Sequence, residues 1–267
     1  TYTSHIRDES DYTVGVVEAV EEVIDVARRS GIPSVVTHVK ALGPPVWGFG
    51  AVIRRRIEVA REEGVEVYTD QYPYTASATS LAAALLPRWS QAGGTDSLMA
   101  RFNRPGVMAD IRSAIVDNLA RRGGADRIQF RRVGFDESIE GRLLSELARE
   151  RDEDPIDIAI DLLHRGGASI ISYNMDEEDL RILMSMPWNM TASDGGLVPW
   201  MEGVPHPRSY GTFPRKIRHY VLEEGIVDLP SAIRSMTGLP AQVFRMSDRG
   251  VLRAGAYADV VVFDDSN

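Results

Sequence analysis

Two short segments of this 267-residue chain share one order of residue types: a hydroxyl residue, a histidine, a β-branched residue and a cation. They are Ser4-His5-Ile6-Arg7 and Thr37-His38-Val39-Lys40, and one helical pattern separates them. This order predicts a strand, a helix and a second strand, with each histidine placed where an apolar strand ends. Two imidazoles at the carboxyl ends of neighbouring parallel strands can bind one metal ion. The two segments therefore predict a metal site at His5 and His38.

A third candidate for chemistry is Asp194, which ends a predicted strand and precedes Gly195-Gly196. A metal ion lowers the pKa of its bound water to about 7, which makes hydroxide available at neutral pH. A carboxylate within hydrogen-bond reach can take the proton of that water and later pass it to a leaving amine. We expect Asp194 to act in this way, with the glycines allowing the substrate to approach closely.

Each of these residues also has a purely structural interpretation. A single histidine after a strand is often only a polar side chain in a loop, and Ser-Asp-Gly is common in turns. The pairing of the two histidine segments favours the metal site over that interpretation. The remaining histidines lack such a setting and are interpreted as structural or surface residues: His164, His206 and His219.

The composition restricts the class of protein. Hydrophobic residues make up 43% of the chain and charged residues 26%, as in ordinary globular domains. The net charge of -9 argues against nucleic acid as the main partner. The chain has no cysteine, so any metal must be held by imidazole and carboxylate. No apolar run approaches the roughly 18 residues of a membrane span, so we expect no membrane partner and a cytoplasmic location.

The elements around the two histidines follow a regular order. Apolar residues at helical spacing over 16–27 predict a helix that ends at Gly31. A second helix is predicted over 51–63 and a third strand over 65–70. Strands that alternate with helices through short links predict an α/β fold with a parallel sheet and right-handed crossovers.

This order is interrupted between residue 75 and about residue 140. The segment is rich in glycine turns, with weak helical patterns at 80–86 and 107–121 and a possible edge strand over 127–133. An insertion on the ligand side of a sheet often acts as a lid, and a structural excursion fits equally well. Beyond the insertion, the pattern predicts helices over 141–150, 213–224 and 229–237, a helix capped by Asp154, strands over 168–173 and 189–194, and a β-arm over 250–263.

Seven motifs together resemble the N-acyl-D-amino-acid deacylases, or D-aminoacylases, of the amidohydrolase superfamily. In chain order they are Ser4-His5-Ile6-Arg7-Asp8-Glu9, Thr37-His38-Val39-Lys40, Asp70-Gln71-Tyr72-Pro73-Tyr74, Ala192-Ser193-Asp194-Gly195, His206–Arg215, Met236–Ala241 and Gly255–Asp264. The resemblance spans nearly the whole chain and is weakest around residues 88–135.

The resemblance implies a distorted metal-dependent-hydrolase (β/α)8 barrel, in which the fifth, sixth and eighth strands carry His5, His38 and Asp194. We accordingly expect residues 1–248 to form the C-terminal part of such a barrel, about strands five to eight, with a helical insertion over about 75–140. Residues 249–267 are expected to begin a small β-sandwich domain.

The resemblance further implies zinc-dependent hydrolysis of an N-acyl-D-amino acid to a carboxylate and a free D-amino acid. The two histidines would hold zinc, and the aspartate would serve as general base and acid. Lys40 and Tyr72 match positions that hold the α-carboxylate of the substrate in the family, and both supply donors to an anion. Arg7 is expected to support its histidine, and Asn174-Met175 to form part of the substrate's side-chain pocket.

The sequence departs from the family in one large respect. The His-Xaa-His pair of the family's first strand and the bridging cysteine ligand of D-aminoacylases are not in this sequence. We therefore expect a piece of a longer polypeptide that is inactive alone. Its inward faces would need the N-terminal half of the barrel, or another chain, to cover them.

Two other functions stay open at this point. One is a cyclic amidase of the dihydroorotase or hydantoinase kind, which uses the same two histidines and aspartate with a different carboxylate-binding set. The other is a truncated, metal-free relic that binds a partner or has no role.

Overall fold

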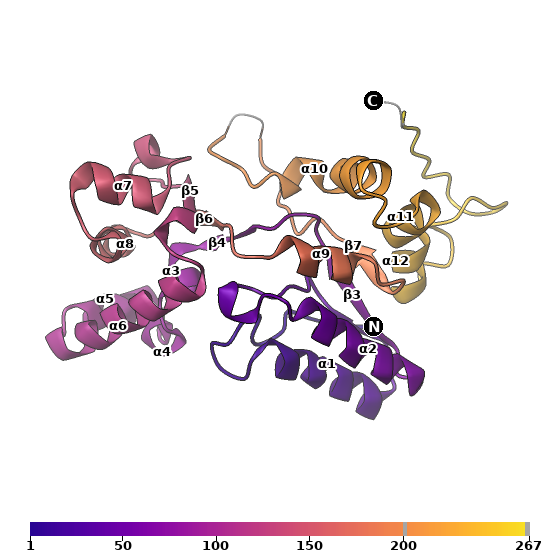
Figure 1. Ribbon diagram of the computed structural model, residues 1–267, viewed down its shortest axis with the longest axis horizontal. Coiled ribbons are helices and arrows are strands. Elements are labelled where there is room, and N and C mark those ends of the chain that lie inside the picture. The colour runs from indigo at the N-terminus through magenta and orange to yellow at the C-terminus, as the bar shows by residue number, and fades with distance from the viewer. Residues whose placement is uncertain (200–201, 265–267) are drawn as a thin grey trace. The chain divides into compact units, whose positions relative to one another are not determined.

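The computed structural model describes residues 1–199 and 202–264, and the chain forms two compact units (Figure 1). The first unit comprises Thr1–Tyr74, Met175–Gly196 and Pro207–Asn267, and the second comprises Thr75–Asn174 and Leu197–His206. Each unit has its own sheet and its own hydrophobic core.

A four-stranded parallel sheet forms the centre of the first unit. Its strands lie in the order β1 (Tyr2–Ser4), β2 (Ser34–Val36), β3 (Val67–Gln71) and β7 (Asn189–Thr191). The prediction of a parallel α/β sheet from the first seventy residues is confirmed. Because all four strands run in the same direction, the loops that follow them emerge at one edge of the sheet.

Three helices of the first unit complete its α/β layers: α1 (Val16–Ser30), α2 (Gly50–Glu62) and α9 (Glu177–Met184). Helices α1 and α2 lie side by side (Figure 1). The apolar face predicted for α1 is buried, and Gly31 ends that helix with a φ of 66°. Burial of each valine or isoleucine on this face contributes about 1.5–3 kcal/mol.

The last part of the first unit is helical. It consists of α10 (Arg208–Arg215), the π-helical segment η4 (Lys216–Glu223), α11 (Leu229–Met236) and α12 (Gly238–Val243). The helix predicted over 213–224 is therefore divided at residue 215. Side chains of α12 pack against the sheet, where Leu239 and Val243 meet Val35, Tyr68 and Met190.

The predicted β-arm over 250–263 is wrong. Residues 244–264 contain no strand, and apolar side chains there, such as Val261 and Val262, are exposed to solvent. A strand is not stable without a partner strand or a packing surface, and this segment pairs with none among the described residues. The proposal that 249–267 begins a β-domain rests on the resemblance alone, and residues 265–267 lie outside the described residues.

The second unit is built on a three-stranded antiparallel sheet. Its strands lie in the order β4 (Ser77–Ser80), β6 (Ser169–Ser172) and β5 (Ile128–Arg132). The predicted strands over 127–133 and 168–173 are present. Strand β4 was not predicted, because its sequence Ser-Ala-Thr-Ser carries little hydrophobic signal.

Helices of the second unit surround a core centred on Phe130 and Ile170. They are α3 (Leu81–Leu85), α4 (Arg88–Gln91), α5 (Gly94–Phe102), α6 (Pro105–Arg121), α7 (Leu144–Arg151) and α8 (Pro155–His164), with short 3-10 turns at η2 (Ala125–Arg127) and η3 (Glu137–Ile139). Asp154 caps α8 as predicted, since its Oδ1 accepts from the backbone N–H of Ile156 at 2.8 Å. Across residues 1–199 and 202–264, none of the helices combines the length and the apolar character that a membrane crossing requires.

Candidate functional site

The two histidines face each other at one edge of the parallel sheet. His5 Nδ1 lies 2.7 Å from His38 Nε2, and the ring centroids are 4.5 Å apart. His5 directly follows β1 and His38 comes two residues after β2. Because β1 and β2 are parallel neighbours, the two loops emerge together and bring the rings into contact.

Backbone strain marks two of the candidate residues. Among the described residues, the non-glycine residues with positive φ are His38 (40°), Asp152 (53°), Asp194 (46°) and Arg245 (58°). The left-handed conformation of a non-glycine residue costs roughly 1–3 kcal/mol and is often found at functional sites. The backbone N–H of His38 donates to Asp70 Oδ1 at 2.6 Å, which holds that strained residue in place.

Glu9 is a member of this cluster whose role sequence reasoning missed. Its Oε1 lies 3.0 Å from His38 Nδ1 and forms an ion pair with Lys40 Nζ, which is itself 2.7 Å from His38 Nδ1. The sequence motif that contains Glu9 assigns it no role, although a carboxylate four residues after a candidate metal ligand is a usable signal. The structure gives it the position of a partner that orients the His38 ring.

Burial and pairing act in opposite directions on this ion pair. Burial opposes ionisation of Glu9, but Lys40 and His38 outweigh it and hold the pKa of Glu9 well below its usual range. Burial likewise disfavours the Lys40 ammonium, yet the Glu9 carboxylate raises the pKa of Lys40 above its ordinary value. Both groups are therefore charged at neutral pH.

Asp194 follows β7 at the same edge and pairs with a second cation. Its Oδ2 lies 2.7 Å from Arg208 Nη1, and the side chain is 41% exposed while that of Arg208 is 9% exposed. The Asp194 carboxylate is close enough to contribute to the pKa values of His5, Lys40 and Tyr72. The structure thus brings the three predicted catalytic and metal-binding residues to one place.

Tyr72 lies between two cations. The Arg208 guanidinium is 4.7 Å from the centre of its ring, and Lys40 Nζ is 5.8 Å from the same centre. Tyr72 follows β3 directly, and burial raises the pKa of its hydroxyl, so the phenol stays protonated. The sequence predicts no role for Arg208, because nothing local connects it with residues more than a hundred positions earlier.

Gly195 has a different purpose from the one expected. A Cβ atom at this position would lie 2.8 Å from Ser209 Cα and 3.1 Å from Arg208 O, which is too close for any side chain. A Cβ atom at Gly196 would meet nothing within 4 Å. Gly195 therefore lets the chain after Asp194 pass close to the start of α10, which brings Arg208 to the carboxylate.

Three further residues were predicted for the site: Arg7, Asn174 and Met175. Arg7 forms an ion pair with Glu22 on α1 through a side chain that is 56% exposed, and its expected support of His5 stays a prediction. Met175 is half-buried and begins the second segment of the first unit, whereas Asn174 lies in the second unit, within hydrogen-bond distance of Ser77.

The remaining histidines have structural partners, as predicted. His206 is buried and its Nε2 lies 2.9 Å from Ala76 O. His164 stacks on Phe102 with ring centroids 4.4 Å apart. His219 lies 3.0 Å from a carboxylate oxygen of Glu223.

The donor set suits a zinc ion. Nitrogen atoms of His5 and His38 and a carboxylate oxygen of Glu9 lie within 4.8 Å of one another. Partial burial lowers the pKa of His5, which favours the neutral ring that binds metals. Zinc prefers imidazole nitrogen and takes four ligands, so the two histidines fill half of such a site.

Comparison with known proteins gives consistent relatives. Residues 50–267 match the sequence profile of the Amidohydrolase family. The chain is 35% identical over 263 residues to the N-acyl-D-glutamate deacylase of Alcaligenes xylosoxydans xylosoxydans, and 33% identical over 263 residues to the D-aminoacylase of the same organism. Each alignment covers 98% of this chain and 45% of the relative, so the chain spans about half the length of the curated relatives it matches.

Solved structures agree with the sequence matches. One is the N-acyl-D-glutamate deacylase from Bordetella bronchiseptica, in complex with zinc and a phosphonate inhibitor that mimics the tetrahedral intermediate of its reaction. The TM-score is 0.74 at 33% identity, over 98% of this chain and 46% of the other. A D-aminoacylase structure matches with a TM-score of 0.73 at 29% identity, over 99% and 46% of the two chains. The resemblance to D-aminoacylases is confirmed.

Proposed function

This chain belongs to the amidohydrolase family, and from that premise we propose that its protein hydrolyses the amide bond of N-acyl-D-amino acids with the help of zinc. The observation that carries the proposal is the convergence of His5, His38 and Asp194 after strands of one parallel sheet, beside the cations Lys40 and Arg208. We further propose that β1, β2, β3 and β7 are the fifth to eighth strands of a barrel that the rest of the polypeptide, or another chain, completes.

In this proposal His5 Nδ1 and His38 Nε2 hold the metal. Zinc supplies a water of lowered pKa and polarises the carbonyl group of the substrate. Glu9 Oε1 lies 3.0 Å from His38 Nδ1, and in the tautomer that carries a proton on Nδ1 it would accept that N–H and leave Nε2 available to hold the metal. The further zinc ligands come from polypeptide other than this chain, whose length is about half that of its relatives.

Asp194 moves the proton. Its carboxylate takes a proton from the attacking water and delivers it to the amide nitrogen as the carbon–nitrogen bond breaks. Arg208 Nη1 lies 2.7 Å from Asp194 Oδ2 and holds the carboxylate in position through this ion pair. The strained backbone of Asp194 fixes the carboxylate against the cluster.

Lys40, Tyr72 and Arg208 bind the α-carboxylate of the substrate. The three side chains are adjacent, and a hydrogen bond from a cation to a carboxylate is about twice as strong as a neutral one. Arg208 can serve both Asp194 and a substrate, because a guanidinium has five N–H donors. A fixed anchor for the α-carboxylate orients one enantiomer of the amino acid toward the metal.

An assay of the complete enzyme tests the proposal. The zinc-loaded protein is offered the N-acetyl derivatives of D- and L-amino acids together with cyclic amides such as hydantoin and dihydroorotate, and amine release or ring opening is measured. We expect turnover of the D-enantiomers alone. Turnover of cyclic amides would replace the proposal by a cyclic amidase, and absence of both zinc and turnover would support a non-catalytic protein.

A further inference from the structure

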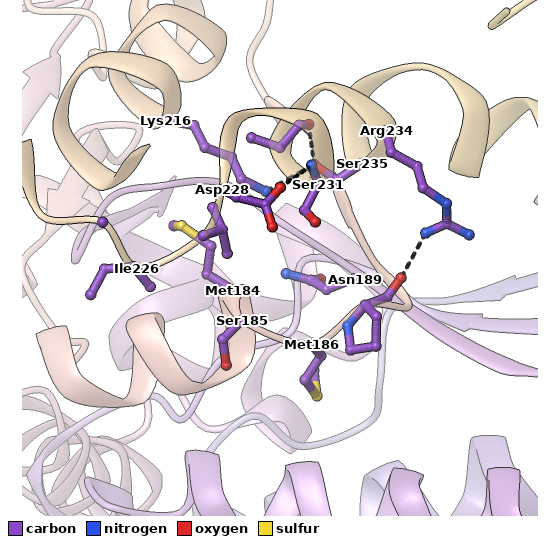
Figure 2. Close-up of a pocket in the computed structure, with 14 residues that line it drawn as sticks. Met184, Ser185, Met186, Asn189, Lys216, Ile226, Asp228, Ser231, Arg234 and Ser235 are labelled. Atoms are coloured by element: carbon purple, nitrogen blue, oxygen red, sulfur yellow. Dashed lines mark hydrogen bonds between the residues drawn. The ribbon is translucent and has the colours of Figure 1, made fainter. Parts of the chain in front are cut away.

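A second feature of the first unit lies apart from the residues discussed so far. A cavity of about 250 Å³ opens between the turn that precedes β7, the start of η4, and α11 (Figure 2). Its polar lining includes Lys216, Asn189, Ser231 and Ser235, and Met184 and Met186 form apolar wall. None of these residues belongs to the proposed active site.

Lys216 is the charged group of this cavity. The residue is 3% exposed, and its Nζ donates to Thr191 Oγ1 at 2.8 Å and to Ser235 Oγ at 3.0 Å. Both acceptors are neutral, and an ammonium has three N–H groups, so one donor remains for a further acceptor. Among the described residues, no carboxylate lies within ion-pair distance of Lys216.

The single carboxylate among the residues that line the cavity is committed elsewhere. Asp228 Oδ1 accepts from the backbone N–H of Ser231 at 2.7 Å and so caps α11. The other cation on the lining, Arg234, points away from Lys216 and donates to Pro187 O at 2.9 Å (Figure 2). Lys216 therefore carries a buried positive charge that has no carboxylate within ion-pair distance among the described residues.

The use of lysine at this position is unusual for this chain. The sequence contains 30 lysine and arginine residues, of which only Lys40 and Lys216 are lysine. Both are buried, and Lys40 has a carboxylate partner. Lys216 also begins η4, and π-helical segments are frequently found at functional sites.

We propose that this cavity binds a small monoanionic carboxylate, with Lys216 as the cation that receives it. One buried ammonium matches one negative charge, whereas a divalent anion would leave an excess charge buried. The remaining N–H of Lys216 would donate to the carboxylate, and the methionine side chains accommodate a short apolar tail. The inference does not depend on the proposed deacylase activity, because it uses no residue of that site.

Nuclear magnetic resonance of the protein labelled with [ε-13C]lysine tests the proposal directly. This chain contributes two lysine signals, from Lys40 and Lys216, and the Lys216→Met variant identifies which belongs to Lys216. We expect sodium acetate to shift the Lys216 signal saturably and to raise the pH at which it titrates, since a bound anion favours the ammonium form. Acetamide, which is neutral and similar in shape, and sodium chloride at the same ionic strength should leave the signal unchanged.

The Lys40 signal separates this proposal from the proposed function. A response of Lys40 alone would place acetate at the substrate site and overturn the second site. A Lys216 signal that ignores acetate, or follows acetamide equally, would also overturn it. Calorimetric titration then compares two matched variants. Acetate binding at this cavity should be lost in Lys216→Met and retained in Arg234→Met. If Lys216→Met does not fold, Lys40→Met assigns the two signals instead, and the titration of the wild-type protein still decides.

Discussion

The two lysines of this chain have the same degree of burial and opposite electrostatic surroundings. Lys40 is 5% exposed and Lys216 is 3% exposed. The Glu9 carboxylate raises the pKa of Lys40, whereas burial among neutral hydroxyls lowers the pKa of Lys216 to about 8. The comparison shows that the partner, and not the depth of burial, decides whether a buried ammonium is stabilised.

The difference also separates two kinds of site. The Lys40 region is internally neutralised, with Glu9 paired to Lys40 and Asp194 paired to Arg208. Such a region can hold its charges in place for chemistry without a ligand. In the Lys216 cavity the ammonium has no carboxylate partner from the protein, and in our proposal a bound carboxylate neutralises it.

The largest expected effect is on turnover, which should depend on the proposed active site and not on the Lys216 cavity. In the complete enzyme, Asp194→Asn should lower kcat by about 10²–10⁴-fold, because the general acid and base is lost, while zinc content stays intact. The matched control is Asp228→Asn on the Lys216 cavity, which should keep wild-type turnover. Steady-state kinetics and metal analysis measure both. Wild-type rates in Asp194→Asn would remove this residue from the mechanism.

The next prediction removes the carboxylate partner of Lys40, so that both lysines are buried without an ion pair. Glu9→Gln leaves Lys40 buried without a carboxylate, so we expect a loss of about 3–5 kcal/mol in the free energy of unfolding. Chemical denaturation of the metal-free protein at pH 7 measures it. Glu22→Gln, which breaks the exposed pair with Arg7, is the control and should change stability far less. Equal effects of the two variants would contradict the role assigned to the Glu9–Lys40 pair.

Removal of the Lys216 charge should raise the free energy of unfolding, whereas Glu9→Gln lowers it. One pKa unit corresponds to about 1.4 kcal/mol, so the depression of Lys216 from 10.5 to about 8 predicts that Lys216→Met gains about 3 kcal/mol of stability below pH 8. Between about pH 8 and 10.5 the unfolded chain binds the proton that the folded chain has released. Wild-type stability therefore rises relative to the variant across this window.

Thermal unfolding of both proteins from pH 6 to 11 gives the measurement. The advantage of the variant should disappear at the alkaline end. The paired lysine behaves in the opposite way, because the pKa of Lys40 is raised and its stabilisation is lost only as pH rises through that higher value. A constant difference between wild type and Lys216→Met at all pH values would show that the charge is not the cause.

The smallest effect compares the lysines in substrate binding. Removal of a charged hydrogen bond costs about 1.5–3 kcal/mol, so Lys40→Met should lower kcat/KM for the N-acyl-D-amino acid by about 10–100-fold. Lys216→Met should leave it unchanged. The amide analogue of the substrate, which lacks the α-carboxylate charge, should lose most of the difference between wild type and Lys40→Met. Equal losses in the two variants would contradict the assignment of Lys40 to the carboxylate.

Much of the fold of the first unit was predictable, because its signals are local. Apolar spacing over 16–27 and the stop at Gly31 define α1, and short links on either side require parallel strands. In the second unit the hydrophobic signal was weaker. Strand β4 escaped prediction for that reason. In the first unit, the arm over 250–263 was wrongly predicted because its apolar residues find no partner strand among the described residues.

The sequence by itself determined that His5, His38 and Asp194 end strands of one parallel sheet, since strand direction places their loops at one edge. The tertiary structure alone decided who pairs with whom: Glu9 with Lys40, Arg208 with Asp194, and Lys216 with the hydroxyls of Thr191 and Ser235. The physical reason is that periodicity arises within one element, whereas the partner of a charge depends on which distant segments pack against it. The same residue type at the same depth became an ion pair in one place and an unbalanced cation in another.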